Sequence, residues 1–218
     1  MRRRQITVVF ALLSLCGFLT LSLVACGGGG GNSEATSAPT DEARTTCKPP
    51  ADATPGTFAS IPQGMAEYRS PERGYRVLYP ADWRAKPNTV AVANIAGDVF
   101  FSSDTTGKVT PNISVTCETV PIGTNSGDFI DSKRAVIQKI TGKIPDVEKT
   151  MTVNGNEAAS VTYDMQTTQT PEPIAIEKVE IYFADDMGGW TLALTAPAGA
   201  IDSYRPAFDA LVQSYNRP

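Results

Sequence analysis

Histidine is absent from the 218 residues of this chain. The absence removes the side chain on which most hydrolytic sites depend, because Ser-His-Asp triads, Cys-His dyads and the HExxH zinc motif all need an imidazole. The sequence also lacks a phosphate-binding loop of the Gly-x-x-x-x-Gly-Lys type. We therefore expect a protein that is not an enzyme and that carries no cofactor.

Long apolar runs are scarce, and the one such run lies at the N-terminus. Residues 6–24 contain no charge and come one residue after Arg2, Arg3 and Arg4, which is the pattern of a secretory signal. The run closes on Leu23-Val24-Ala25-Cys26, which resembles the bacterial lipobox. The resemblance implies cleavage after residue 25, acylation of Cys26 and a lipid-anchored protein on the extracytoplasmic face of the cell membrane.

Two alternatives to this processing stay open. An uncharged run of this length could also stay in the bilayer as an uncleaved anchor, although hydroxyl residues such as Ser14 and Thr20 weaken that interpretation. Plain secretion without an anchor is the other.

Cysteine is rare as well, with four in the chain. Cys16 lies in the signal and Cys26 is the expected lipidation site, which leaves Cys47 and Cys117 for the mature protein. A bridge between these two closes a loop of 70 residues, and in the chain-entropy account it would stabilise the fold by about 4 kcal/mol in an oxidising compartment. The alternative is two separate thiols, with Cys117 buried in a strand. Two thiols without histidine predict no metal site.

Positive charge is in deficit. The chain has a net charge of −4, and removal of a signal that holds three arginines and no acid takes it to −7. An acidic surface repels nucleic-acid phosphates and anionic headgroups. We therefore expect no nucleic-acid binding, membrane attachment through the acyl chains on Cys26, and a protein or small ligand as the partner.

Gly, Ser, Thr, Ala and Pro dominate from Gly27 to Pro55, without hydrophobic periodicity. Such a segment cannot bury a core, and it is typical of a flexible tether. The expected organisation is a signal peptide at 1–25, a lipidated cysteine and linker at 26–57, and one globular domain at 58–218 that is large enough to bury its own core.

Alternation with a period of two predicts most of the domain to be strands. They are expected at 74–80, 90–102, 112–120, 150–153, 157–165, 178–183 and 190–194. Asn154-Gly155 predicts a type I′ hairpin between the fourth and fifth of these. Val179, Ile181 and Phe183 should face one side of their strand, and Lys178, Glu180 and Tyr182 the other.

Helical spacing occurs twice. The first helix is expected at 127–143, with Asp128 as its N-cap and one apolar stripe made by Phe129, Ile130, Val136, Ile137 and Ile140. The second is expected at 201–215, with Pro206 in its first turn, where a helix tolerates proline.

Strands in hairpins with two helices predict an α+β fold, an antiparallel sheet with helices packed against it. The segment from Tyr68 to Trp83, with its Gly74-Tyr75 and Tyr79-Pro80, resembles the opening of PsbP-like domains, which include DcrB and LpqN-type envelope lipoproteins. The segment from Tyr204 to Ser214 is similar to the last helix of that family.

The resemblance covers residues 66–216 in element order. It implies an α-β-α sandwich with a sheet of about six to seven strands and two main helices. It also implies binding rather than chemistry. The metal ligands proposed for plant members cannot be carried over, because histidine is absent.

Two pairs of residues are candidates for a site. Trp83 and Trp190 could form a binding surface that stacks on sugars or anchors a partner, or they could be core residues. Asp185 and Asp186, in a turn flanked by glycine, could bind calcium or act as an acid pair, or they could be solvated turn residues whose side chains point apart.

Together these observations predict a membrane-anchored, extracytoplasmic accessory or binding module of the cell envelope, without catalytic activity. A lipid-tethered carrier of small solutes or lipids is the first alternative, and it requires an apolar cavity between sheet and helix. A carboxylate-dependent hydrolase is the second, and it requires two converging acids with shifted pKa values in one cleft.

Overall fold

The computed structural model of the chain describes residues 43–53, 56–92, 94–167 and 172–217. Within them, seven antiparallel strands form one sheet in the order β3-β4-β5-β9-β8-β7-β6, and β1 and β2 form a separate two-stranded sheet. The α+β prediction is therefore confirmed. In chain order the elements are β1 (Met65–Arg69), β2 (Arg76–Pro80), β3 (Arg84–Val92), β4 (Ile95–Phe101), β5 (Asn112–Glu118), α1 (Ser126–Thr141), β6 (Lys149–Val153), β7 (Asn156–Gln166), β8 (Ala175–Ala184), β9 (Gly189–Pro197) and α2 (Ile201–Ser214).

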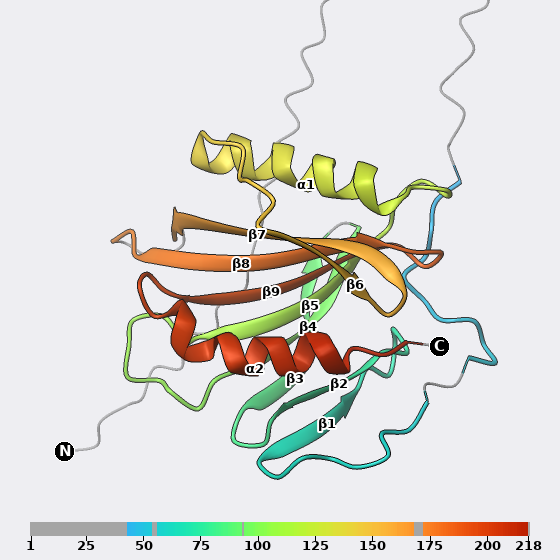
Figure 1. Ribbon diagram of the computed structural model, residues 1–218, viewed down its shortest axis with the longest axis horizontal. Coiled ribbons are helices and arrows are strands. Elements are labelled where there is room, and N and C mark those ends of the chain that lie inside the picture. Colours follow the sequence, from blue (N-terminus) through green and yellow to red (C-terminus); the bar gives the residue numbers. More distant parts are fainter. Residues whose placement is uncertain (1–42, 54–55, 93, 168–171, 218) are drawn as a thin grey trace, which may run out of the picture.

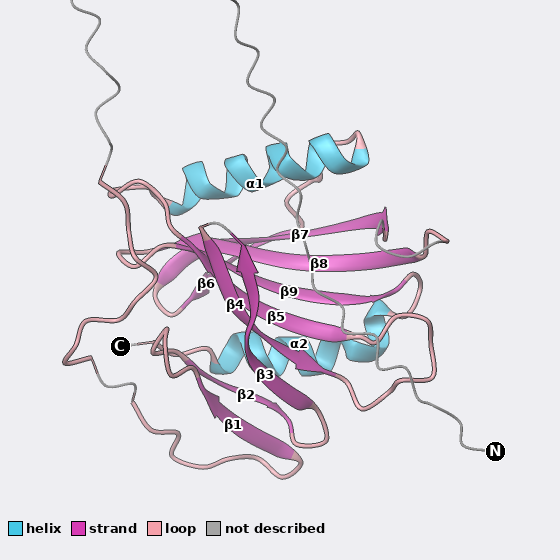
Figure 2. Cartoon of the chain, turned by 180° about the vertical axis from the view of Figure 1, so that it is seen from behind, coloured by secondary structure: helices cyan, strands magenta, loops and turns pink. Residues whose placement is uncertain are grey.

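The two helices pack against opposite faces of the large sheet. Val179, Ile181 and Phe183 of β8 belong to the core cluster that contains the buried face of α2. Tyr182 and Ala184, on the other face of the same strand, belong to the cluster that contains the buried face of α1. Figures 1 and 2 show α1 beside β7 and β8, and α2 lying across the other face of the sheet next to the small β1–β2 sheet.

The predicted hairpin at Asn154-Gly155 is confirmed, whereas the hairpin between β3 and β4 was not predicted. Asn154 and Gly155 both have positive φ, 48° and 84°, as a type I′ turn requires. The single strand predicted at 90–102 is instead the hairpin β3–β4, in which Val92 pairs with Ile95. Apolar residues continue on both sides of that tight turn and no glycine marks it, so alternation alone did not reveal the break.

The helix ends also differ from the prediction. Asn125, not Asp128, caps α1: its side chain accepts a hydrogen bond from the backbone N–H of Asp128 at 2.9 Å, and Asp128 lies in the first turn. Pro206 is the sixth residue of α2 and so lies beyond the first turn. Since proline has no N–H, α2 lacks the hydrogen bond to the carbonyl of Asp202.

The apolar stripe of α1 is narrower than predicted. Phe129, Ile130 and Ile137 are buried against β7 and β8. Val136 and Ile140 are 47% and 55% exposed. Helical spacing placed all five on one side, but the sheet covers only part of that side.

The fold begins before residue 58, where the composition had placed its start. The backbone N–H of Thr45 donates to the carbonyl of Val120 at 2.9 Å, and that of Cys47 to the carbonyl of Met187 at 2.9 Å. A disulfide joins Cys47 to Cys117 of β5 across a Cα separation of 5.8 Å, so the first of the two sequence alternatives holds. The bridge fastens the N-terminal arm to the middle of the sheet.

Asp98 of β4 connects the small sheet to the large one. Its buried carboxylate accepts hydrogen bonds from the hydroxyls of Ser70 (2.8 Å) and Tyr75 (2.6 Å) and from the backbone N–H of Asn88 (2.8 Å). Arg73, itself 3% exposed, pairs with the same carboxylate at 3.2 Å. The carboxylate of Asp98 thereby binds both the loop between β1 and β2 and the edge strand β3.

Replacing Asp98 by alanine should destabilise the fold by about 3–5 kcal/mol, because the change leaves the guanidinium of Arg73 buried without a charged partner, with only the neutral amide oxygen of Asn88 as its acceptor. Guanidinium denaturation at pH 7 measures the loss. The matched control is Asp82→Ala, which removes an exposed hydrogen bond to Ser103 and should change the stability by less than about 0.5 kcal/mol. Equal losses in the two variants would contradict this role of Asp98.

Candidate binding site

A groove lies between α2 and the strands at one edge of the large sheet. Helix α2 packs over β9 and over β2 of the small sheet. Beside it a pocket remains over β8, β7 and β6, although most apolar residues on this face of the three strands are buried in the core. The resulting cavity has a volume of about 250 Å³. It is lined by Glu148, Lys149, Met151, Ser160, Ile181, Arg205 and Asp209.

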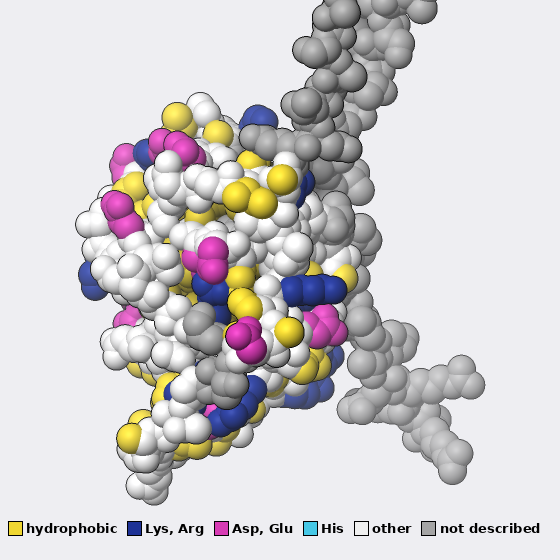
Figure 3. Space-filling model, turned by 90° about the vertical axis from the view of Figure 1, so that its right-hand side faces the viewer, with side chains coloured by type: hydrophobic (Ala, Val, Ile, Leu, Met, Phe, Trp, Pro, Cys, Tyr) yellow, Lys and Arg dark blue, Asp and Glu magenta, His cyan; other side chains and the backbone are white. Residues whose placement is uncertain are grey.

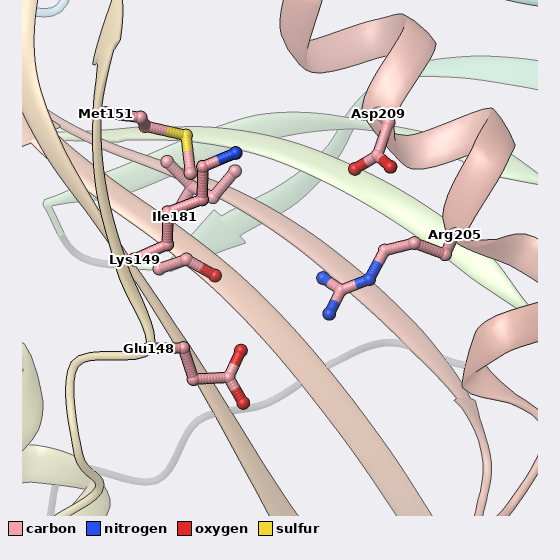
Figure 4. A pocket seen from close by; sticks show the side chains of 7 residues that line it. Glu148, Lys149, Met151, Ile181, Arg205 and Asp209 are labelled. Atoms are coloured by element: carbon pink, nitrogen blue, oxygen red, sulfur yellow. The ribbon is translucent and has the colours of Figure 1, made fainter.

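The groove combines an apolar floor with charges of both signs. Figure 4 shows Arg205 and Asp209 on the α2 side, and Glu148 and Met151 on the side of β6. Within the part of the chain that the structure describes, the charged ends of Glu148, Arg205 and Asp209 make no hydrogen bond or ion pair. These charges are therefore available to a ligand.

Strand β6 forms one side of this groove and is also the last strand of the sheet. In the sheet it pairs with β7 alone. The backbone N–H and C=O groups along its outer edge are the kind of template to which an extended peptide adds as a further strand.

A buried polar network lies on the opposite face of the sheet, and the sequence did not predict it. Lys178 forms an ion pair with Glu180, and the hydroxyl of Tyr182 donates to the same carboxylate. The side chains of Lys178 and Glu180 are only 19% and 8% exposed. Lys178 also lies over the ring of Tyr163, 5.7 Å from its centroid. Spacing placed these residues on one face of β8, but it could not show how closely that face is covered.

The pKa values of this network follow from burial and pairing. Burial alone would raise the pKa of Glu180, but the charge and hydrogen bond of Lys178 and the hydroxyl of Tyr182 outweigh it and hold that pKa below its usual value. For Lys178, burial acts to lower the pKa, whereas Glu180 and Tyr163 raise it above its usual value. Each charge is compensated by its partner, which is the signature of a structural pair.

The predicted binding surface at Trp83 and Trp190 is wrong. Trp190 is fully buried, and its ring packs against Tyr75, Phe183 and Tyr215 with centroid distances of 5.8–6.3 Å. Trp83 is 8% exposed and packs against Tyr204 of α2. Both rings face the α2 side of the sheet, where core packing leaves them no free face for a ligand. The core alternative is the correct one.

Asp185 and Asp186 do not point apart as the turn geometry predicted, because both carboxylates bond to the same guanidinium nitrogen of Arg217, at 2.9 Å and 2.8 Å. Asp185 is buried, pairs with Arg217 at 2.9 Å and accepts the backbone N–H of Met187 at 2.8 Å, so it is not the solvated residue that we expected. Burial raises the pKa of Asp185. Asp186 is 79% exposed, and its hydrogen bond from Arg217 lowers its pKa. Among the described residues, no group of three or more Cys, Asp or Glu side chains is placed to hold a metal ion.

Comparison of the sequence with family models and with curated proteins gives no match. Among solved structures, the chain is similar to the cyanobacterial PsbP, CyanoP, of Synechocystis sp. PCC 6803 (13% identity, TM-score 0.49, 75% of this chain and 98% of that one). It is also similar to LpqN of Mycobacterium tuberculosis, described as involved in cell envelope biogenesis (11% identity, TM-score 0.42, 76% and 91%). Both names fall within the group that the sequence resembles. At these identities and TM-scores they carry no inference about function.

The expected lipidation site, Cys26, and the signal segment before it lie outside the described residues. In the described part, neither helix has the length and apolar character needed to span a bilayer.

Replacing Lys178 by methionine should cost about 3–5 kcal/mol at pH 7, because it leaves the Glu180 carboxylate buried and unpaired. Because the pKa of Glu180 is lowered in the folded protein, the pair stabilises the wild type at every pH above the usual pKa of a glutamate. This stabilisation is lost as the pH falls through the lowered pKa. In the variant, protonation of Glu180 relieves the penalty, so the loss relative to wild type should shrink at about pH 4. Urea denaturation at the two pH values measures this.

The control for this experiment is Lys108→Met, which breaks an exposed pair with Glu172 and should cost less than about 1 kcal/mol at either pH. A loss in Lys178→Met that does not change with pH would contradict the assignment.

Proposed function

We propose that this chain is a membrane-anchored, extracytoplasmic lipoprotein whose domain serves as a non-catalytic binding module of the cell envelope. The N-terminal sequence supports the anchor through the cationic head, the apolar run and the cysteine that closes it. The Cys47–Cys117 disulfide supports a location outside the reducing cytosol.

The groove between α2 and β6 is the observation that supports binding. It offers unpaired charges of both signs, an apolar floor and an open strand edge. An extended segment of a partner protein fits this combination best, because its backbone can pair with β6 while its charged side chains meet Arg205, Asp209 and Glu148.

The alternatives have less support. A carrier needs an apolar cavity between α2 and the sheet, but the side chains of Trp190, Phe208 and Leu211 are fully buried in that layer. A hydrolase of the type weighed above needs two acids that are free to act in one cleft, whereas the carboxylates of Asp185 and Asp186 are both bound to Arg217 and Asp185 is buried.

Site-specific photocrosslinking tests the groove. A benzophenone amino acid at position 149, on the groove, should give a discrete protein adduct in intact cells, identified by mass spectrometry of the purified complex. The same probe at exposed Lys108, which does not line the groove, should not give that adduct. The charge reversals Arg205→Glu and Asp209→Lys should abolish the adduct at 149. Identical adducts at both positions, or no adduct at 149, would count against a partner in this groove.

Mass spectrometry of the mature N-terminus tests the anchor separately. We expect the first residue to be Cys26 with a diacylglycerol on its sulfur. The variant Cys26→Ser should accumulate as an uncleaved precursor, because lipobox processing requires the modified cysteine. An unmodified mature N-terminus, or normal processing of Cys26→Ser, would contradict the anchor without bearing on the groove.

A further inference from the structure

Exposed hydrophobic side chains are concentrated around α1. Six large hydrophobic residues are exposed in the described part of the chain, and Ile122, Val136, Ile140, Ile144 and Val147 are five of them. All five lie in α1 or in the loops that flank it. We define Val136, Ile140, Ile144 and Val147, at the C-terminal end of the helix, as the α1 patch. Figure 3 looks onto the side of the molecule where α1 begins, and hydrophobic side chains are visible at the top of that view; the α1 patch lies at the other end of the helix.

The loop after α1 is held in place, so the patch is a formed surface. The Nε of Arg134 donates to the carbonyl of Pro145 at 2.9 Å and draws the loop back against the helix. Gly142 ends α1 with φ of 78°, and the hydroxyl of Thr141 bonds to the carbonyl of Lys143. Ile144 is thereby presented close to the end of the helix that carries Ile140.

The charges around the patch are opposite in sign to the net charge of the chain. Residues 132–145 contain four cations and no acid, in a chain whose net charge is −4. Lys133 is paired with Glu118, and Arg134 is bound to the loop and to Asp131. The side chains of the other two, Lys139 and Lys143, make no hydrogen bond or ion pair with a described residue, and each directly precedes an exposed isoleucine.

Two acidic residues flank Val147 at the end of the patch that follows the helix. Asp146 and Glu148, both exposed, come after Ile144. The helical part of the patch is therefore cationic as well as apolar, which is the combination that binds anionic lipid surfaces.

The chain also enters the fold on this side. The carbonyl of Ala43 accepts the backbone N–H of Ile122 at 3.0 Å, so the start of the described chain lies beside the loop that leads into α1 (Figure 1). Sixteen residues separate Cys26 from Ala43, and a Gly/Ser-rich chain of that length has a root-mean-square span of about 20–24 Å. Helix α1 has 16 residues and is about 24 Å long, so an anchor at Cys26 brings the whole helix within reach of the bilayer.

We propose that the α1 patch docks on the anionic lipid surface of the membrane that holds the anchor. Ile140 and Ile144 enter the boundary between headgroups and acyl chains, while Lys139 and Lys143 contact lipid phosphates. The proposal rests on the lipid anchor of the proposed function for its location.

A fluorescent label at position 144 tests the docking. In the expected mature protein Cys26 is acylated and Cys47 is bridged to Cys117, so a cysteine introduced as Ile144→Cys is the only free thiol for a nitrobenzoxadiazole label. The purified lipoprotein is reconstituted in vesicles of phosphatidylcholine alone or with about 30% phosphatidylglycerol. The emission at 144 should shift to the blue and rise with phosphatidylglycerol. A label introduced as Thr105→Cys, in an exposed loop tied to α2 by the Asp104–Tyr204 hydrogen bond, should not respond.

Charge variants give the expected size of the effect. Lys139→Gln and Lys143→Gln should each lower the equilibrium constant for docking about fivefold, whereas Lys108→Gln should leave it unchanged. The labels at 144 and 105 responding alike would overturn the proposal. So would a shielding of 144 that rises with protein concentration instead of phosphatidylglycerol, because that result would assign the patch to a second copy of the chain.

Failure of the anchor is distinguished from failure of the docking. If the mature N-terminus is not acylated, Cys26 is replaced by serine so that position 144 keeps the only free thiol, and the labelled protein added to preformed vesicles still reports whether position 144 enters an anionic surface. A response there with no acyl group would overturn the anchor alone. No response at 144 in a protein with acylated Cys26 would overturn the docking alone.

Discussion

The buried carboxylate of Asp98 is the constraint on which the arrangement of the two sheets depends. A charge removed from water in the interior must be matched by donors, and the donors here come from the loop between β1 and β2 and from β3. The irregular register of β3 between Lys86 and Val90 and the positive φ of Asn88 follow, because that backbone turns its N–H toward Asp98. Tyr75, held by the same carboxylate, extends into the ring cluster around Trp190 and Tyr215.

Interactions of this kind explain which parts of the fold could be predicted from the sequence. The Asn154-Gly155 turn, the alternation in β8 and the apolar spacing of α2 are local signals, and the structure confirms each of them. Asp98 has its partners 10 to 28 positions away, and nothing in the surrounding pattern distinguishes it from a surface aspartate. The hairpin between β3 and β4 was missed because of its local sequence. The residues before and after its turn are also compatible with one continuous strand.

Prediction of the site was limited by what covers each face. Alternation assigned Trp190 to one face of β9, and it could not show that α2 and the small sheet close over that face. Arg205 and Asp209 are ordinary polar positions of an amphipathic helix, as Glu148 and Lys149 are at the start of a strand. These four residues form a site only because α2 does not reach the edge of the sheet, so that β6 lies next to the helix. This arrangement depends on how α2 packs on the sheet and cannot be read from the sequence of α2 or of β6 alone.

Net charge does not decide the proposed docking, for a related reason. A chain with an expected mature charge of −7 should avoid anionic lipid, yet charges farther away than about 8 Å are largely screened at physiological ionic strength. A surface that reaches a bilayer is therefore governed by its nearest charges, and next to Ile140 and Ile144 these are Lys139 and Lys143. The apolar residues act in the same direction, because the sheet covers only part of α1 and leaves Val136 and Ile140 in water. The two faces of the sheet thus differ in chemistry: α1 presents a cationic and apolar surface, and α2 a groove of mixed charge.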